Sequence, residues 1–276
     1  MKHITFLVAA FAATIVTMTS CQQDSQEYVV DVQAHRGGMG LRPANTLEAM
    51  KNAIDLGVNT LEMDIVVTKD NKVVLCHDKY FTWQETTRPD GTFITKEEPR
   101  TYLWHLTYDE IKKYDVGQRQ HPNYPEQVTM PAVRPLLSDV LTFTENYAKE
   151  KGLAPLKYNI EIKADPDYDG GIEGESWPVY NEFVDICVSV LQSFNLGDRL
   201  IVQSFDDRVL NYLHEKYPEF ILSYLVDANA PDFDTYMSYL KFTPQWLSPH
   251  HSITDETLVK KCREKGMKIV PWTVDK

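Results

Sequence analysis

The sequence predicts an α/β fold in which helices cover a parallel β-sheet, and a (β/α)8 barrel fits the pattern best. The first observation is that short apolar runs alternate with amphipathic stretches along most of the chain. Repeated strand–helix units of this kind build parallel sheets. The second is size: 276 residues, 43% hydrophobic and 25% charged, suffice for one large domain or two small ones. Seven such units over this length favour a barrel over an open sheet.

Seven short runs, rich in β-branched and apolar residues, are the candidates for the parallel strands. They are 29–35, 60–67, 157–163, 199–204, 220–226, 245–248 and 267–274. One more run, at 73–76, follows the segment TKDNK at 68–72, which is typical of a hairpin turn. We therefore expect residues 73–76 to form a return strand beside 60–67.

Amphipathic spacing predicts helices between the strands. The stretch 47–56 carries apolar residues at helical spacing and is followed by Gly57, which suits a C-terminal cap. Three further helices are predicted at 138–151 with Ser138 as N-cap, at 178–194 beginning with Pro178, and from a capping Thr254 to Gly266.

Residues 79–135 break the repeat as a long stretch rich in Pro, Tyr and charge. Within it, 107–114 is a short helical candidate. Irregular segments of this length are unusual and often cover an active site. We therefore expect an insert of about residues 79–135 in a domain that spans 29–276.

The N-terminal residues resemble an export signal. Lys2 precedes an uncharged apolar run at 4–18, which is short for a membrane span. Small residues then precede Cys21, as in bacterial lipoprotein signals. We expect residues 1–20 to be a signal peptide, Cys21 to carry a lipid, and 21–28 to be a tether. The protein would then be exported and lipid-anchored to a bacterial membrane, on the periplasmic or cell-surface side. The alternative is an ordinary signal peptide in which Cys21 is incidental.

Charge and cysteine content exclude some classes of protein. Twenty-eight Lys and Arg against 40 Asp and Glu give a net charge of −12, which argues against nucleic-acid binding. Three cysteines remain besides Cys21, and they are Cys76, Cys187 and Cys262. An odd, widely spaced set argues against a disulfide framework or a zinc site. We expect these three to be buried apolar residues.

Charged residues inside the apolar strand runs are the first candidates for a site. Glu62 and Asp64 are spaced i and i+2 within one run, as are Glu161 and Lys163 in another, so each pair shares a face of its strand. Such charges are costly to bury unless they are paired or bind a metal. Three converging carboxylates would suit a hard divalent cation. The alternative is that these residues face solvent.

Two histidines stand at the ends of neighbouring strand candidates. His35 ends the first candidate and His77 follows the return strand. Two imidazoles at one site can act as general acid and general base near neutral pH. Arg36, next to His35, offers a guanidinium fork for phosphate oxygens.

The ordered set of motifs resembles the glycerophosphodiester phosphodiesterase family. The matching segments are HRGG at 35–38, RPANT at 42–46, EMD at 62–64, TKD at 68–70, VVLCHD at 73–78, EIK at 161–163, QSF at 203–205 and WTV at 272–274. Together they extend over nearly all of the chain that would follow the signal peptide. The resemblance implies a TIM barrel of the phospholipase C-like phosphodiesterase type, with its site at the carboxyl ends of the strands.

The resemblance also implies roles for single residues. Those matching the metal ligands are Glu62, Asp64 and Glu161, which in the family usually hold Ca²⁺ or Mg²⁺. His35 and His77 match the catalytic acid/base pair. Those matching substrate-binding residues are Arg36 and Lys163, which would face the phosphate, and Trp272, which would form an aromatic wall. Which histidine is the acid is left open, as is attack by water or by a substrate hydroxyl.

Two departures from the family pattern stand out. Ala44 occupies a position where members usually have Glu, which removes a polar group near the mouth of the site. Members also continue beyond the position of Lys276, so we expect either that the last helix and an eighth strand are missing from this chain or that a segment not recognised as a strand closes the sheet.

The resemblance implies metal-dependent hydrolysis of a glycerophosphodiester to an alcohol and glycerol 3-phosphate. One alternative is a lipid-directed phosphodiesterase of the phospholipase C or D kind on the same fold. Another is a non-catalytic lipoprotein that binds a phosphorylated ligand. Trp83, Trp104 and the tyrosines of 79–124 are expected either to line a headgroup pocket or to form the core of the insert. The oligomeric state is left open.

Overall fold

The computed structural model describes residues 31–58, 60–169 and 177–274. The predicted signal peptide at 1–20, the lipidation residue Cys21 and the tether at 21–28 lie outside these residues. Within the described ranges, no helix is both long enough and apolar enough to cross a bilayer.

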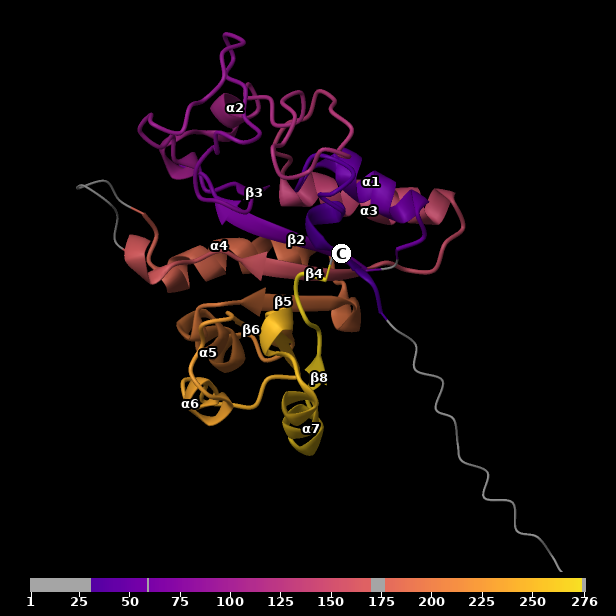
Figure 1. The fold of residues 1–276 in the computed structure, drawn as a ribbon, viewed down its shortest axis with the longest axis vertical. Coiled ribbons are helices and arrows are strands. Elements are labelled where there is room, and N and C mark those ends of the chain that lie inside the picture. Colours follow the sequence, from indigo (N-terminus) through magenta and orange to yellow (C-terminus); the bar gives the residue numbers. More distant parts are fainter. Residues whose placement is uncertain (1–30, 59, 170–176, 275–276) are drawn as a thin grey trace, which may run out of the picture. The chain divides into compact units, whose positions relative to one another are not determined.

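A curled sheet of seven parallel strands forms the centre of the fold (Figure 1). Its order is β1-β2-β4-β5-β6-β7-β8, so each parallel strand lies beside its neighbour in sequence. The parallel strands are β1 (Gln33–Ala34), β2 (Thr60–Val67), β4 (Lys157–Ile162), β5 (Leu200–Ser204), β6 (Ile221–Val226), β7 (Trp246–Pro249) and β8 (Lys268–Ile269). Each of the seven predicted strands is present. The return strand β3 (Val73–Leu75) pairs antiparallel with β2, as predicted.

The central strand β2 shows why the sequence forms this sheet. All eight of its residues are buried, and Leu61, Met63 and Ile65 alternate with Glu62 and Asp64. Successive side chains of a strand point to opposite faces. One face of β2 therefore joins the apolar core, and the other carries its two carboxylates into the interior of the curled sheet.

Helices connect the strands and flank the sheet (Figure 1). They are α1 (Leu47–Asp55), α2 (Tyr108–Ile111), α3 (Leu137–Glu150), α4 (Tyr180–Ser193), α5 (Asp207–Lys216), α6 (Phe233–Met237) and α7 (Glu256–Glu264). The structure adds α5 and α6 to the helices predicted above.

Two predicted N-caps are wrong. Leu136 precedes α3, so Ser138 lies inside the helix. Asp255, and not Thr254, caps α7, because its carboxylate accepts a hydrogen bond from the Leu258 N–H at 2.7 Å. A carboxylate at this position satisfies an otherwise unpaired backbone donor and opposes the positive end of the helix dipole.

The insert packs around aromatic side chains, and one of their partners comes from outside it. Trp104 is buried and lies 4.0 Å, between ring centroids, from Trp177, which precedes α4. Phe81 stacks on Tyr114 with their centroids 4.2 Å apart. A short helix, α2, begins after Thr107, whose hydroxyl and N–H both bond to Glu110 in a capping box.

The edge strands are shorter than predicted. β8 has two residues where 267–274 was expected, although pairing with the β7 segment continues beyond Pro271, where the Trp272 N–H donates to the Pro249 carbonyl at 3.0 Å. Among the described residues, no ladder joins β1 to β8. The two ends of the sheet nevertheless meet, because Thr273 Oγ1 lies 3.4 Å from His35 Nδ1. The cysteines Cys76, Cys187 and Cys262 are free and buried, as expected.

Candidate active site

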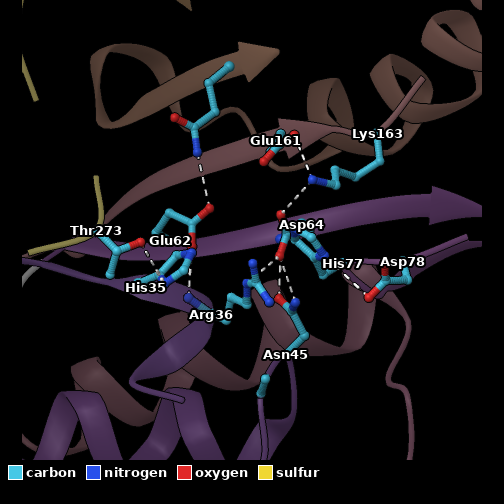
Figure 2. A network of polar contacts seen from close by, with 12 residues as sticks. His35, Arg36, Asn45, Glu62, Asp64, His77, Asp78, Glu161, Lys163 and Thr273 are labelled. Carbon is cyan, nitrogen blue, oxygen red and sulfur yellow. Dashed lines mark hydrogen bonds and ion pairs between the residues drawn. The ribbon is translucent and has the colours of Figure 1, made fainter. Parts of the chain in front are cut away.

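Three carboxylates from two adjacent strands meet in the interior of the sheet (Figure 2). The parallel register places Asp64 of β2 directly beside Glu161 of β4. Glu62, Asp64 and Glu161 are only 6%, 1% and 6% exposed, and each offers an oxygen within 4.8 Å of the others'. The solvent-facing alternative is therefore wrong for all three.

Two cations and an amide surround Asp64. Arg36 Nε and Lys163 Nζ each lie 3.5 Å from its carboxylate, and Asn45 Nδ2 donates to it at 2.8 Å. Burial acts to raise the pKa of Asp64, but the nearby positive charges outweigh it and hold the pKa well below its usual range. Asp64 is therefore ionised in the buried site.

For the two glutamates, nearby positive charges do not outweigh the effect of burial on the pKa. Burial, reinforced by the charge of Asp64, raises the pKa of Glu62 well above its usual range. Burial also raises the pKa of Glu161 to about 7, although Lys163 donates to its carboxylate at 2.8 Å and opposes the rise. The three carboxylates can carry more negative charge than the neighbouring cations neutralise. A group of oxygen ligands with this excess of negative charge suits a hard divalent cation such as Ca²⁺ or Mg²⁺.

Glu62 is held from two sides. The Arg36 backbone N–H donates to one carboxylate oxygen at 2.7 Å, and Gln203 Nε2 donates to the other at 3.0 Å. Gln203 in turn accepts a hydrogen bond from Asn159 Nδ2 at 3.1 Å. This chain of amides comes from β4 and β5, and it orients a carboxylate of β2.

The two histidines flank the carboxylates in different environments. His35 begins a tight turn after β1, and burial, with the adjacent Arg36 charge, lowers its pKa to about 4. The side chain of His77, which follows β3, is 36% exposed, and its Nδ1 lies 3.3 Å from Asp78 Oδ2. One imidazole is therefore neutral and enclosed, whereas the other is accessible and beside an acid.

Left-handed backbone makes the turn after His35 possible. Arg36, Gly37 and Gly38 have φ angles of 51°, 77° and 87°. A Cβ atom on Gly37 would lie 2.7 Å from Ala49 Cβ, so α1 packs directly on this glycine. The close contact brings the Arg36 N–H to Glu62 and its side chain to Asp64.

Two aromatic residues, Phe205 and Trp272, lie next to the site. Trp272 Nε1 donates to the Ser248 carbonyl at 2.9 Å, and its ring meets Phe205 edge-on with centroids 5.4 Å apart. Lys163 Nζ lies 5.9 Å from the centre of the Phe205 ring. Trp272 is thus connected to the site through Phe205 and through its neighbour Thr273, which contacts His35.

The structure brings together every site residue predicted in the described part of the chain except Trp272, which is connected to the others through Phe205 and Thr273, and it adds four. These are Gln203 and, as Figure 2 shows, Asn45, Asp78 and Thr273. All four lie within the motif segments quoted above. Their positions in the sequence gave no indication of their partners, because most of those partners come from distant strands.

Comparisons with known proteins agree on one family. A profile of the glycerophosphoryl diester phosphodiesterase family matches residues 35–276. A glycerophosphodiester phosphodiesterase of Caldanaerobacter subterraneus is 27% identical over 247 residues, which cover 89% of this chain and 86% of that protein.

Solved structures share the fold. A protein from Silicibacter pomeroyi assigned to the glycerophosphoryl diester phosphodiesterases superposes with a TM-score of 0.77 at 25% identity, covering 90% of this chain and 84% of that one. A phosphodiesterase of Oleispira antarctica, solved with the product sn-glycerol-3-phosphate, has a TM-score of 0.67 at 22% identity, covering 90% and 85% of the two chains.

Proposed function

The chain belongs to the glycerophosphoryl diester phosphodiesterase family, and from this we propose that its buried acidic site hydrolyses glycerophosphodiesters to an alcohol and glycerol 3-phosphate. The observation that carries the proposal is the group Glu62, Asp64 and Glu161, flanked by two histidines. A phosphodiester is anionic, so a site of carboxylates alone would repel it. The site therefore has to supply positive charge as well.

The positive charge has two sources. When bound, a divalent cation held by Glu62, Asp64 and Glu161 would stabilise the charge that develops on the phosphate oxygens. Arg36 and Lys163 border the same carboxylates and would face the phosphate as fixed cations. Both Ca²⁺ and Mg²⁺ suit the oxygen ligands, and we propose no preference between them.

The two histidines would divide the proton transfers. The pKa of about 4 keeps His35 neutral at pH 7, so it can accept a proton from the attacking hydroxyl. Asp78 Oδ2 lies 3.3 Å from His77 Nδ1, which leaves Nε2 as the atom that would donate a proton to the leaving alcohol. His77 is the more exposed of the pair, which suits contact with a departing group.

The test is an assay of the purified full chain in detergent. We expect release of glycerol 3-phosphate from a mixture of glycerophosphodiesters, dependent on Ca²⁺ or Mg²⁺ and abolished by chelator. Glu62→Gln and His35→Asn should each reduce kcat at least a hundredfold. Glu219→Gln and His214→Asn, at exposed positions, are the matched controls.

Two outcomes of this assay would overturn the proposal. Ligand binding without turnover by the folded chain would favour a binding lipoprotein. Cleavage of intact acyl lipids in preference to the deacylated diesters would favour a lipid-directed phosphodiesterase.

We also propose that the curled sheet is that of a (β/α)8 phosphodiesterase barrel and that the enzyme is exported and lipid-anchored. The parallel strand order and the site at the strand ends support the barrel. The apolar run at 4–18 followed by Cys21 supports the anchor. Radiolabelled fatty acid should enter the wild-type protein in bacterial cells but not Cys21→Ala, and equal labelling of both would contradict lipidation.

A further inference from the structure

A cavity of about 220 Å³ lies beside the candidate active site, between the strand ends and the insert. His77, Arg36 and Asn45 border it on the side of the site. The insert supplies much of the remaining lining. Because His77 lines this cavity and His35 does not, the cavity accommodates the part of a substrate that lies next to His77.

The insert lines this cavity with hydrogen-bonding side chains. Thr82, Gln84, Asn123 and Tyr124 offer hydroxyl and amide groups that both donate and accept. A ligand with several hydroxyl groups could satisfy them together. Apolar lining is limited to Met39 and Ala44 at the edge near the site.

The two carboxylates that border the cavity already have side-chain partners. Glu85 forms an ion pair with the buried Arg134 and also accepts from Thr82 Oγ1 at 3.3 Å. Asp78 lies beside His77. A cationic headgroup would need an available carboxylate or a cage of aromatic rings.

That cage is not provided by the insert. Neither Trp83 nor Trp104, which were expected either to line a headgroup pocket or to form the core of the insert, lines the cavity, and Trp104 is buried against Trp177. Among the described residues that do line it, Tyr124 and His121 supply the only aromatic rings, and their centroids lie 4.9 Å apart. The surroundings therefore favour an uncharged ligand over choline or ethanolamine.

The volume of this cavity is small for a lipid chain. Pockets for drug-sized ligands measure about 300–1,000 Å³, and this one is smaller. It suits an alcohol of headgroup size.

We propose that this cavity binds the leaving alcohol and selects a small, uncharged polyhydroxy alcohol, such as glycerol or inositol. The inference rests on the proposed function, in which His77 protonates the leaving oxygen. Gln84 and Asn123 are then specificity-determining residues, because their amides bind hydroxyl groups of the headgroup. Arg134 and Glu85 hold the wall of the cavity through their ion pair and through the Arg134 bond to the Ala44 carbonyl at 2.7 Å.

The experiment compares four substrates with the full chain in the presence of Ca²⁺ or Mg²⁺. These are glycerophosphoglycerol, glycerophosphoinositol, glycerophosphocholine and glycerophosphoethanolamine. We expect kcat/KM to be at least tenfold higher for the better of the two polyol esters than for either amine ester. Gln84→Ala and Asn123→Ala should each lower kcat/KM about fivefold on the polyol esters, as the loss of one hydrogen bond implies, and less than twofold on glycerophosphocholine.

Gln118→Ala, an exposed position in the same insert that does not line the cavity, is the matched control and should change neither value. Circular dichroism melts check that each variant is folded. Equal or faster hydrolysis of the amine esters would overturn the polyol inference while the phosphodiesterase activity stands. An equal loss on all four substrates would place the shared glycerol arm in the cavity and would also overturn it. No hydrolysis of any substrate by the folded wild type would instead overturn the proposed function.

Discussion

At the scale of single residues, the site is defined by carboxylates in surroundings that disfavour their charge. Asp64 keeps its charge because Arg36 and Lys163 lie beside it. Glu62 and Glu161 have pKa values raised mainly by burial. A cation bound among the three would provide the compensation that the protein lacks.

Because the three carboxylates have too little positive charge near them, binding of the cation should stabilise the folded protein. For wild type, Ca²⁺ or Mg²⁺ at 100 times its dissociation constant should raise the free energy of unfolding by about 2.7 kcal/mol. Glu161→Gln should lose most of this gain at the same ion concentration. In chelator, the variant should unfold within about 1 kcal/mol of wild type, because relief of a costly buried charge offsets the weakened contact with Lys163.

Urea unfolding with and without the ion measures both quantities, and Glu219→Gln is the control at an exposed position. If the ion raised the free energy of unfolding of Glu161→Gln as much as that of wild type, the cation would not bind at this group.

Gln203 is a positioning residue in this scheme. It donates to Glu62 and accepts from Asn159, so Gln203→Leu would leave one carboxylate oxygen of Glu62 without its donor. Loss of such a supporting contact usually lowers metal affinity about 10–100-fold. Titration calorimetry with Ca²⁺ or Mg²⁺ should show a decrease of this size. The exposed Gln192→Leu should leave the affinity unchanged, and an unchanged affinity in Gln203→Leu would mean that Gln203 does not position the ligand.

At the scale of elements, the turn between β1 and α1 connects backbone geometry to the site. Gly37 and Gly38 share positive φ angles, but only Gly37 contacts α1. Its lack of a side chain lets the turn approach Ala49, which places Arg36 over the carboxylates. Helix α1 then begins at Leu47 with Thr46 as its cap.

The two glycines offer a matched pair of variants. Gly38→Ala should incur the cost of a strained φ alone, because no atom lies within 4 Å of the added Cβ. Gly37→Ala should cost a further 1–3 kcal/mol, roughly the penalty for overpacking, and should also reduce activity by displacing Arg36. Urea unfolding measures the difference. Equal losses of stability in the two variants would show that contact with α1 is unimportant.

At the scale of the whole molecule, contacts between distant segments hold the sheet in its curled form. Arg199, just before β5, donates to both carboxylate oxygens of Glu145 on α3 at 2.8 and 2.9 Å. It also donates to the Leu156 carbonyl before β4 at 2.7 Å. One guanidinium thus joins a helix to two neighbouring strands.

This contact predicts a pH-dependent part of the stability. Burial acts to raise the pKa of Glu145, but hydrogen bonds from Arg199 and Tyr158 outweigh it, so the pKa is lowered in the folded state. A lowered pKa stabilises the fold above the unfolded-state value of about 4.3, and the gain is lost as pH falls through the folded value. Glu145→Gln should therefore cost about 1 kcal/mol at pH 7, allowing for partial solvent exposure, and almost nothing near pH 3.

Urea unfolding of both proteins across this pH range measures the difference. Glu150→Gln, an exposed change later in the same helix, should be neutral throughout. A difference between Glu145→Gln and wild type that persists unchanged in acid would contradict the assignment.

Much of this protein could be read from the sequence, because the periodicities involved are local. Alternation within 60–67 places Glu62 and Asp64 on one face, and the parallel order follows from repeated strand–helix units. The motif order predicted the family that the comparisons show. Element ends were less predictable. Asp255 and Thr254 are both good capping residues, and only the packed backbone selects Asp255.

The tertiary structure decided what depends on residues far apart in the chain. Gln203 meets Glu62 across 141 positions, and Thr273 meets His35 across 238. Trp104 is part of the hydrophobic core, and not of a headgroup pocket, because Trp177, outside the insert, packs on it. Local spacing determines which face of a strand or helix a side chain occupies, so the sequence by itself determined the strands and the shared face of Glu62 and Asp64. Contacts between elements depend on how the sheet curls, and only the tertiary structure determined the partners of those residues and the cavity beside them.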